Sequence, residues 1–203
     1  MNHIFRKGSN PDAPVLLLLH GTGGNEHDLL PLAEMISPGS SVLGVRGNVL
    51  ENGMPRFFRR LAEGVFDLED LVLRTKELSA FVDEAAERYE FDRRNVVAIG
   101  YSNGANIAAS MIFHEKDVLR GAILHHAMVP LRDIQLPDLA GLSVFIGAGE
   151  NDPMIPVQGT QELQNMLENA GAEVTMHWER HGHQLTRTEV EAAARWFAEQ
   201  YTA

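Results

Sequence analysis

The sequence contains no cysteine among its 203 residues. This absence excludes disulfide bonds, thiol nucleophiles and metal sites built on cysteine. Basic residues are also few, because 17 Lys and Arg stand against 28 Asp and Glu, giving a formal net charge of −11. Such a charge repels phosphate backbones and anionic lipid, so we expect neither nucleic acid nor a membrane as a partner.

Long apolar runs are missing too. The longest, Val15–Leu19, is far too short to span a bilayer. The first residues, Met1 to Phe5, lack the basic region and apolar core of a secretory signal, so we expect a cytoplasmic protein. The hydrophobic content of 44% is sufficient for a sizeable core, and residues 1–203 are expected to form a single domain.

Short apolar runs alternate along the chain with segments of helical period. The runs are Val15–Leu19, Val42–Val45, Val96–Ile99, Gly121–Leu124, Val144–Ile146 and Val174–Trp178. Continuous runs of this kind are typical of strands that are covered on both faces, as in a parallel sheet. Between them, apolar residues recur at i, i+3, i+4 and i+7, as in the series that starts at Leu78. The sequence therefore predicts an α/β fold with a mostly parallel, twisted sheet and helices on both faces.

Two details refine this expectation. Residues His3 to Arg6 could add an edge strand. Thr186 and Glu189 have the spacing of a capping box, in which each side chain bonds a backbone N–H at the start of the last helix.

Residues 46–66 show neither a continuous apolar run nor apolar residues at helical spacing. A loop of this length inside a compact domain is usually functional or disordered, and its three phenylalanines argue against disorder. We expect the segment to fold over the top of the sheet. Phe57 and Phe58, together with Met128 and Ile155, are expected to form the walls of a substrate pocket.

The segment Gly100–Gly104 has the pattern G-x-S-x-G, which follows the predicted strand Val96–Ile99 and opens an apolar helix. This strand–turn–helix context is the one that presents a serine nucleophile on a sharp, strained turn. Ser102 is therefore the candidate nucleophile. The alternative interpretation is an ordinary turn whose serine caps the helix.

A serine hydroxyl needs a neighbouring base at neutral pH. His183 lies between the last strand and the last helix, at the same edge of the sheet, and Gly182 lets its backbone approach the site. His181 is the alternative base. His125 and His126 follow a central strand, where they are either polar residues at a strand end or part of the cleft.

An acid should hold the histidine ring in one tautomer. Asp152 follows the strand Val144–Ile146, and Pro153 stiffens the turn after it. The order Ser, Asp, His is then the order expected for this arrangement. Glu150 is the alternative acid.

Catalysis of acyl transfer also needs two donors for the developing oxyanion. The glycine-rich segment His20–Gly24 follows the strand Val15–Leu19 and lacks the G-K-[ST] end of a phosphate loop. We assign the donors to the backbone N–H groups of Thr22 and Asn103. His20 is expected to orient the loop through a hydrogen bond.

These motifs together resemble the bacterial phospholipase/carboxylesterase family of serine α/β-hydrolases, which are relatives of acyl-protein thioesterases. The similarity runs from about Pro14 to Phe197 and is most specific at His20–Gly24, Gly100–Ala105, Gly149–Pro153 and Gly182–Thr186. The resemblance implies an α/β-hydrolase fold with a minimal lid or none. It also implies that the enzyme needs no metal and no cofactor, hydrolyses short-chain or aromatic esters, and is commonly a homodimer.

The expected activity is that of a serine carboxylesterase acting on a small-molecule ester through an acyl-enzyme. An acyl thioesterase or lysophospholipase could use the same residues, and a non-catalytic ligand-binding protein could share the fold. Asn103 stands where the acyl-protein thioesterases carry glutamine, which argues against long-chain or protein-bound acyl groups.

A metal hydrolase is a further alternative, with three closely spaced histidines as ligands, His177, His181 and His183. No HExxH pattern accompanies them. We expect a solvated face to carry three arginines, Arg56, Arg59 and Arg60. The alternative is that one of them meets an anionic group of the substrate.

Overall fold

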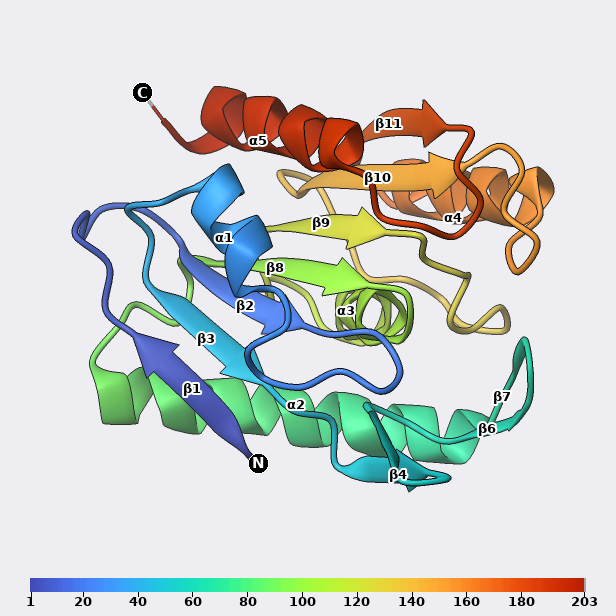
Figure 1. Ribbon diagram of the computed structural model, residues 1–203, viewed down its shortest axis with the longest axis horizontal. Helices are drawn as coiled ribbons and strands as arrows, with labels where there is room; N and C mark the ends of the chain where they lie inside the picture. The colour runs from blue at the N-terminus through green and yellow to red at the C-terminus, as the bar shows by residue number, and fades with distance from the viewer. Residues whose placement is uncertain (203) are drawn as a thin grey trace.

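The computed structural model describes residues 1–202 and has a seven-stranded sheet at its centre (Figure 1). In spatial order the strands are β1 (His3–Arg6), β3 (Val42–Val45), β2 (Val15–Leu19), β8 (Val96–Tyr101), β9 (Gly121–His125), β10 (Ser143–Gly149) and β11 (Glu173–Glu179). All neighbours are parallel except β1, which pairs antiparallel with β3 at one edge. The predicted parallel sheet and its added edge strand are confirmed.

Helices cover both faces of the sheet (Figure 1). One face carries α1 (Leu30–Ile36) and α5 (Arg187–Tyr201), and the other carries α2 (Leu68–Tyr89), α3 (Asn103–His114) and α4 (Val157–Asn169). Along β2, Leu16 and Leu18 pack against the first layer while Leu17 and Leu19 pack against the second. This two-sided burial explains why the strand is a continuous apolar run. Across residues 1–202, no helix combines the length and the apolar character needed to cross a bilayer.

The segment after β3 contains two short antiparallel ribbons that its sequence does not predict. The first ribbon pairs β4 (Val49–Glu51) with β5 (Met54–Arg56), and the second pairs β6 (Arg60–Ala62) with β7 (Val65–Phe66). The segment reaches the carboxyl edge of the sheet, where the N–H of Phe57 donates to Oδ1 of Asn103 at 2.7 Å.

Phe57 and Phe58 join the two ribbons, and their side chains are buried in the core on the α2/α3 side. Their exposed fractions are 2% and 0%.

The start of α5 follows only half of the predicted capping box. Thr186 caps the helix, because its side chain accepts from the N–H of Glu189 at 3.3 Å. The carboxylate of Glu189 does not return to the N-cap. It is fully buried against the end of β9, where it contacts His125 and His126.

Candidate active site

Ser102 occupies the turn between β8 and α3 with φ 51° and ψ −113°, a conformation that is strained for any residue but glycine. The flanking glycines make the turn possible. A Cβ at Gly100 would lie 2.7 Å from the backbone of Ala105, and a Cβ at Gly104 would overlap the carbonyl oxygen of Leu19. The sharp strand–turn–helix connection predicted from the motif is therefore present.

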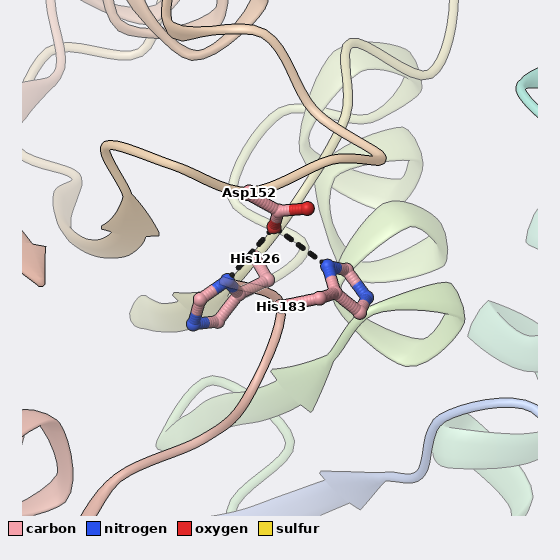
Figure 2. Close-up of side chains that lie close together, drawn as sticks. All are labelled: His126, Asp152 and His183. Carbon is pink, nitrogen blue, oxygen red and sulfur yellow. Dashed lines mark hydrogen bonds and ion pairs between the residues drawn. The ribbon is translucent and has the colours of Figure 1, made fainter. Parts of the chain in front are cut away.

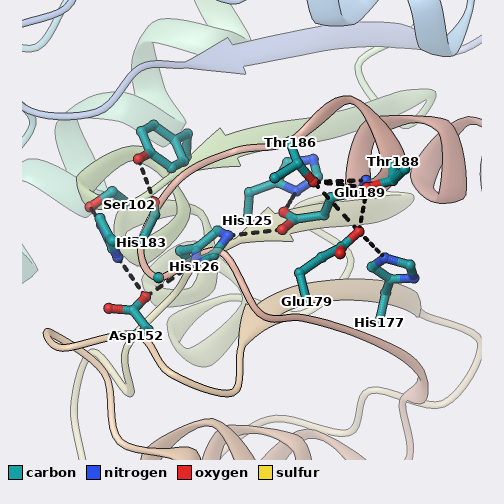
Figure 3. A network of polar contacts seen from close by, with 12 residues as sticks. Ser102, His125, His126, Asp152, His177, Glu179, His183, Thr186, Thr188 and Glu189 are labelled. Atoms are coloured by element: carbon teal, nitrogen blue, oxygen red, sulfur yellow. Dashed lines mark hydrogen bonds and ion pairs between the residues drawn. The ribbon is translucent and has the colours of Figure 1, made fainter.

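Three side chains that are distant in sequence, Ser102, His183 and Asp152, meet at the carboxyl edge of the sheet (Figure 3). Ser102 Oγ lies 2.8 Å from Nε2 of His183. Nδ1 of the same ring lies 2.6 Å from Oδ2 of Asp152. The structure thus brings together the predicted nucleophile, base and acid. In this geometry the ring can accept the serine proton while the carboxylate fixes its tautomer.

The loop that carries His183 is held on both sides. The hydroxyl of Tyr101 donates to the carbonyl oxygen of His183 at 2.7 Å. Gly182 has φ 62°, and its N–H donates to Oδ1 of Asn151 at 3.0 Å. The alternative base His181 is exposed, and the alternative acid Glu150 is exposed beside Arg180. Neither joins the cluster.

Thr22 and Asn103, the predicted oxyanion donors, line the same cavity as Ser102. Asn103 is the first residue of α3, so its N–H has no acceptor within the helix. The loop of Thr22 is fixed by a hydrogen bond from Nη1 of Arg56 to the Thr22 hydroxyl at 2.6 Å. Both residues therefore border the cavity into which Ser102 opens.

His20 ties the Thr22 loop to its surroundings, as expected from the sequence. Its Nε2 accepts from the N–H of Gly47 at 3.0 Å, and its Nδ1 donates to the carbonyl oxygen of Gly21 at 2.6 Å. Burial lowers the pKa of His20, which agrees with a neutral ring that both donates and accepts.

A cavity of about 240 Å³ opens above Ser102 and His183. Met128 and Ile155 line it as predicted. The prediction for Phe57 and Phe58 is wrong, because both rings turn into the core and leave the cavity to other side chains of the segment. Those side chains are Arg56, Arg60 and Phe66.

A larger hollow of about 450 Å³ lies at the opposite, amino edge of the sheet, beside Leu119, Arg120 and Leu142. It contains neither Ser102 nor His183, so the smaller cavity is the candidate site.

Behind Asp152 lies a second, fully buried histidine that the sequence did not assign. Nδ1 of His126 is 3.1 Å from Oδ2 of Asp152, and its Nε2 is 2.8 Å from Oε1 of Glu189 (Figures 2 and 3). His126 has φ 56°, again a strained value for a side chain with Cβ. His125 bonds the other oxygen of Glu189 through Nδ1.

The sequence model of the phospholipase/carboxylesterase family matches residues 2–200. The chain belongs to this family. The putative hydrolase MhqD of Bacillus subtilis (strain 168) is 61% identical over 199 residues, which are 98% of each chain. The crystal structure of a Bacillus cereus carboxylesterase is 65% identical with a TM-score of 0.98, covering 99% of this chain and 95% of that one.

A structure of YahD with malic acid is 37% identical with a TM-score of 0.94, covering 98% of each chain. Membership of the family confirms the expected α/β-hydrolase fold and the expectation that the chain is an enzyme. At this level it is a carboxylesterase-type hydrolase of small-molecule esters.

The protonation of the buried network follows from its geometry. Both ring nitrogens of His126 face carboxylate oxygens, so both must donate and the ring is an imidazolium. Burial opposes this charge, but Glu189 and Asp152 outweigh it and raise the pKa of His126. Burial also opposes the charge of Glu189, yet hydrogen bonds from His125 and His126 lower the Glu189 pKa to about 2.

The same balance acts on Asp152. Burial would raise its pKa, but hydrogen bonds from His183, the N–H of Met154 and His126 lower it overall. Asp152 is therefore ionised at neutral pH, as an acid that stabilises a histidinium must be.

The sequence does contain a signal for the buried pair of His126 and Glu189, which the sequence analysis did not identify. Glu189, Ala192, Ala193 and Trp196 follow the i, i+3, i+4, i+7 spacing, which places a carboxylate on the apolar face of α5. A charged side chain on such a face is almost never buried without a partner. The capping-box pattern offered a simpler explanation for Glu189 and concealed this one.

The metal-hydrolase alternative is not supported by the positions of its ligands. His177 pairs with Glu179 at 2.9 Å, and His181 is exposed. Within residues 1–202, the group able to hold a metal is instead His126, Asp152 and His183, whose ligand atoms lie within 4.8 Å of one another. Hydrogen bonds already account for this cluster, since both rings donate from Nδ1 to one oxygen of Asp152.

Proposed function

We propose that the chain is a serine carboxylesterase that hydrolyses short-chain or aromatic carboxylic esters through an acyl-enzyme on Ser102. His183 is the base and Asp152 is the acid that orients it. The observation that carries the proposal is the unbroken line of contacts from Ser102 Oγ through the His183 ring to Asp152, at 2.8 Å and 2.6 Å, beneath an open cavity.

In the acylation step, Nε2 of His183 accepts the hydroxyl proton as Ser102 Oγ attacks the carbonyl carbon of the ester. The N–H groups of Thr22 and Asn103 hold the resulting oxyanion. The bond to the alcohol oxygen then breaks, and that oxygen takes the proton from His183. In the second step, water loses a proton to His183 and attacks the acyl carbon. The bond from that carbon to Ser102 Oγ then breaks, and Oγ takes the proton back from His183, which releases the carboxylic acid and restores the serine hydroxyl.

The size of the cavity supports small substrates. A volume of about 240 Å³ lies below the usual range for drug-sized ligands, and its apolar walls include Phe66, Met128 and Ile155. A short acyl chain or one aromatic ring suits this space better than a long lipid chain. The relative YahD was solved with malic acid, which is itself a small molecule.

The test is a panel of 4-nitrophenyl esters from acetate to decanoate, with matching thioesters, assayed on wild type and Ser102→Ala. We expect short esters to be preferred and the variant to lose roughly 10⁴- to 10⁶-fold in kcat. The matched control is Ser9→Ala, because Ser9 is exposed and is distant from Ser102 in the sequence. This variant should retain activity. A fluorophosphonate should label Ser102, as located by mass spectrometry.

Other outcomes would redirect the proposal. A preference for thioesters or lysophospholipids would favour those alternatives on the same residues. Binding of esters without turnover in wild type would favour a non-catalytic ligand-binding protein. Retained activity in Ser102→Ala would move the nucleophile elsewhere.

A homodimer and a cytoplasmic location belong to the same proposal. Three leucines expose more than half of their surface and could be covered by a second copy, Leu50, Leu61 and Leu73. Light scattering after size exclusion should give twice the chain mass of 22.5 kDa. Fractionation of cells should place the protein with the cytoplasm. A monomer would contradict the homodimer, and recovery of the protein with membranes would contradict the cytoplasmic location.

A further inference from the structure

A single guanidinium is buried in the wall of the candidate active site. Arg56, at the end of β5, lines the cavity while exposing only 3% of its side chain. Its Nε donates to the carbonyl oxygen of Phe58 at 3.1 Å, and its Nη1 donates to the hydroxyl of Thr22 at 2.6 Å. A guanidinium carries five N–H donors. The hydrogen bonds that Arg56 makes within residues 1–202 use Nε and Nη1 and leave the Nη2 donors for an occupant of the cavity.

The charge around this guanidinium is not balanced. Glu51 lies 3.3 Å from Nε of Arg56, but the same carboxylate also pairs with Arg60 at 2.9 Å. Two cations therefore share one anion. Burial, followed by the charge of Arg60, lowers the pKa of Arg56 to about 10, while Glu51 opposes the change. The group stays protonated at neutral pH, and one positive charge is left in excess at this wall in a protein of net charge −11.

Asn103 supplies an independent observation. Its Oδ1 accepts from the N–H of Phe57 at 2.7 Å, which fixes the other amide atom as nitrogen. That Nδ2 is buried and has no hydrogen-bond acceptor within the described chain. Asn103 lines the same cavity as Arg56. A buried donor without an acceptor is rare in native structures and points to an acceptor that arrives with a ligand.

We propose that the cavity selects esters that carry a second, free carboxylate, such as half-esters of short dicarboxylic acids. Arg56 and Asn103 donate to that carboxylate while the ester carbonyl lies at Ser102. A planar guanidinium and an amide that line one cavity match a planar carboxylate, and one excess positive charge matches a monoanion better than a phosphate dianion. Hydrolysis then converts a half-ester and water into a dicarboxylate and an alcohol.

This inference rests on the proposed function for its chemistry, and a pair of near-isosteric substrates tests it. Monoethyl succinate carries the carboxylate, and ethyl 4-methylpentanoate carries an isopropyl group in its place. We expect wild type to prefer the half-ester by roughly tenfold or more in kcat/KM, because a neutral group leaves the donors unpaired.

Arg56→Met should lower kcat/KM for the half-ester by roughly 10- to 100-fold, chiefly through KM, with a much smaller effect on the neutral ester. Asn103→Asp keeps the acceptor for Phe57 and replaces the free donor with a negative oxygen, so it should act in the same direction. Arg59→Met is the matched control, because that exposed guanidinium pairs with Asp67 away from the cavity and should leave the ratio unchanged.

Arg56 also fixes the Thr22 loop, so a purely structural role is the competing explanation. Equal losses for the two esters in Arg56→Met would show that role and overturn the proposal. The absence of any preference in wild type would overturn it as well.

Binding of succinate to Ser102→Ala, measured by calorimetry, separates this inference from the proposed function. We expect binding that weakens at least tenfold in Ser102→Ala/Arg56→Met. If succinate binds in this way but no ester is hydrolysed, the anion site stands and the esterase proposal fails. If neutral esters are hydrolysed and succinate does not bind, the esterase proposal stands and the anion site fails.

Discussion

Replacing Glu189 with Gln removes the negative charge that two buried histidines share. Hydrogen bonds from His125 and His126 overcome the effect of burial and lower the pKa of Glu189 from 4.5 to about 2. Each pKa unit corresponds to about 1.4 kcal/mol, so the ionised carboxylate contributes about 3 kcal/mol at neutral pH. This magnitude is also typical for removing one partner of a buried ion pair. We therefore expect Glu189→Gln to lower the free energy of unfolding by about 3 kcal/mol at pH 7.

The effect should depend on pH with a definite sign. A carboxylate with a lowered pKa stabilises the fold above its unfolded value of 4.5 and loses this contribution as the pH falls towards about 2. His126, with its raised pKa, contributes fully below 6.5 and loses its contribution as the pH rises through the raised value. Both contributions are complete between pH 4.5 and 6.5. The difference in free energy of unfolding between wild type and Glu189→Gln should therefore shrink below pH 4.5.

Urea unfolding followed by the fluorescence of the two tryptophans measures both quantities. Glu191→Gln is the matched control on the same helix, because Glu191 keeps 44% of its side chain exposed and pairs with Arg187 at the surface. It should change stability by less than about 0.5 kcal/mol. If Glu189→Gln destabilises no more than Glu191→Gln at pH 7, the reasoning about the buried network is refuted.

His126→Gln should raise the pKa of Asp152, because it removes a charged donor, and kcat/KM for a neutral ester should begin to fall at a higher pH than in wild type. A pH–rate profile identical to that of wild type would show that His126 does not act on the acid. Gly104→Ala should destabilise by about 3 kcal/mol or more, since the added Cβ overlaps the Leu19 carbonyl, whereas Gly159→Ala in α4 meets open space and should be neutral or stabilising. Thermal unfolding of the two alanine variants checks this contrast, and equal melting temperatures would contradict it.

The parts of the site that were predictable depend on local patterns. Ser102 follows a continuous apolar strand and lies between glycines, and both features are visible in a few consecutive residues. Asp152 and His183 each follow a later strand of the same parallel sheet. Because parallel strands end at one edge, the sequence order alone was enough to bring the three side chains together.

The parts that failed depend on packing between distant segments. Phe57 and Phe58 face the core in a segment that is attached by a hydrogen bond from Phe57 to Asn103, 46 residues away, and no local period encodes this contact. His126 and Glu189 are 63 residues apart and become partners only through the placement of α5 over the end of β9. Residues 46–66 form ribbons too short for a two-residue period to be recognised.

One atom, Oδ2 of Asp152, serves the reacting surface and the interior at once, because it accepts from His183 and from His126. A substitution of Asp152 that changes the strength of the base therefore also disturbs the contact between His126 and Glu189, which joins the end of β9 to α5. Changes confined to the exposed residues around Gly53 leave both donors of that oxygen in place.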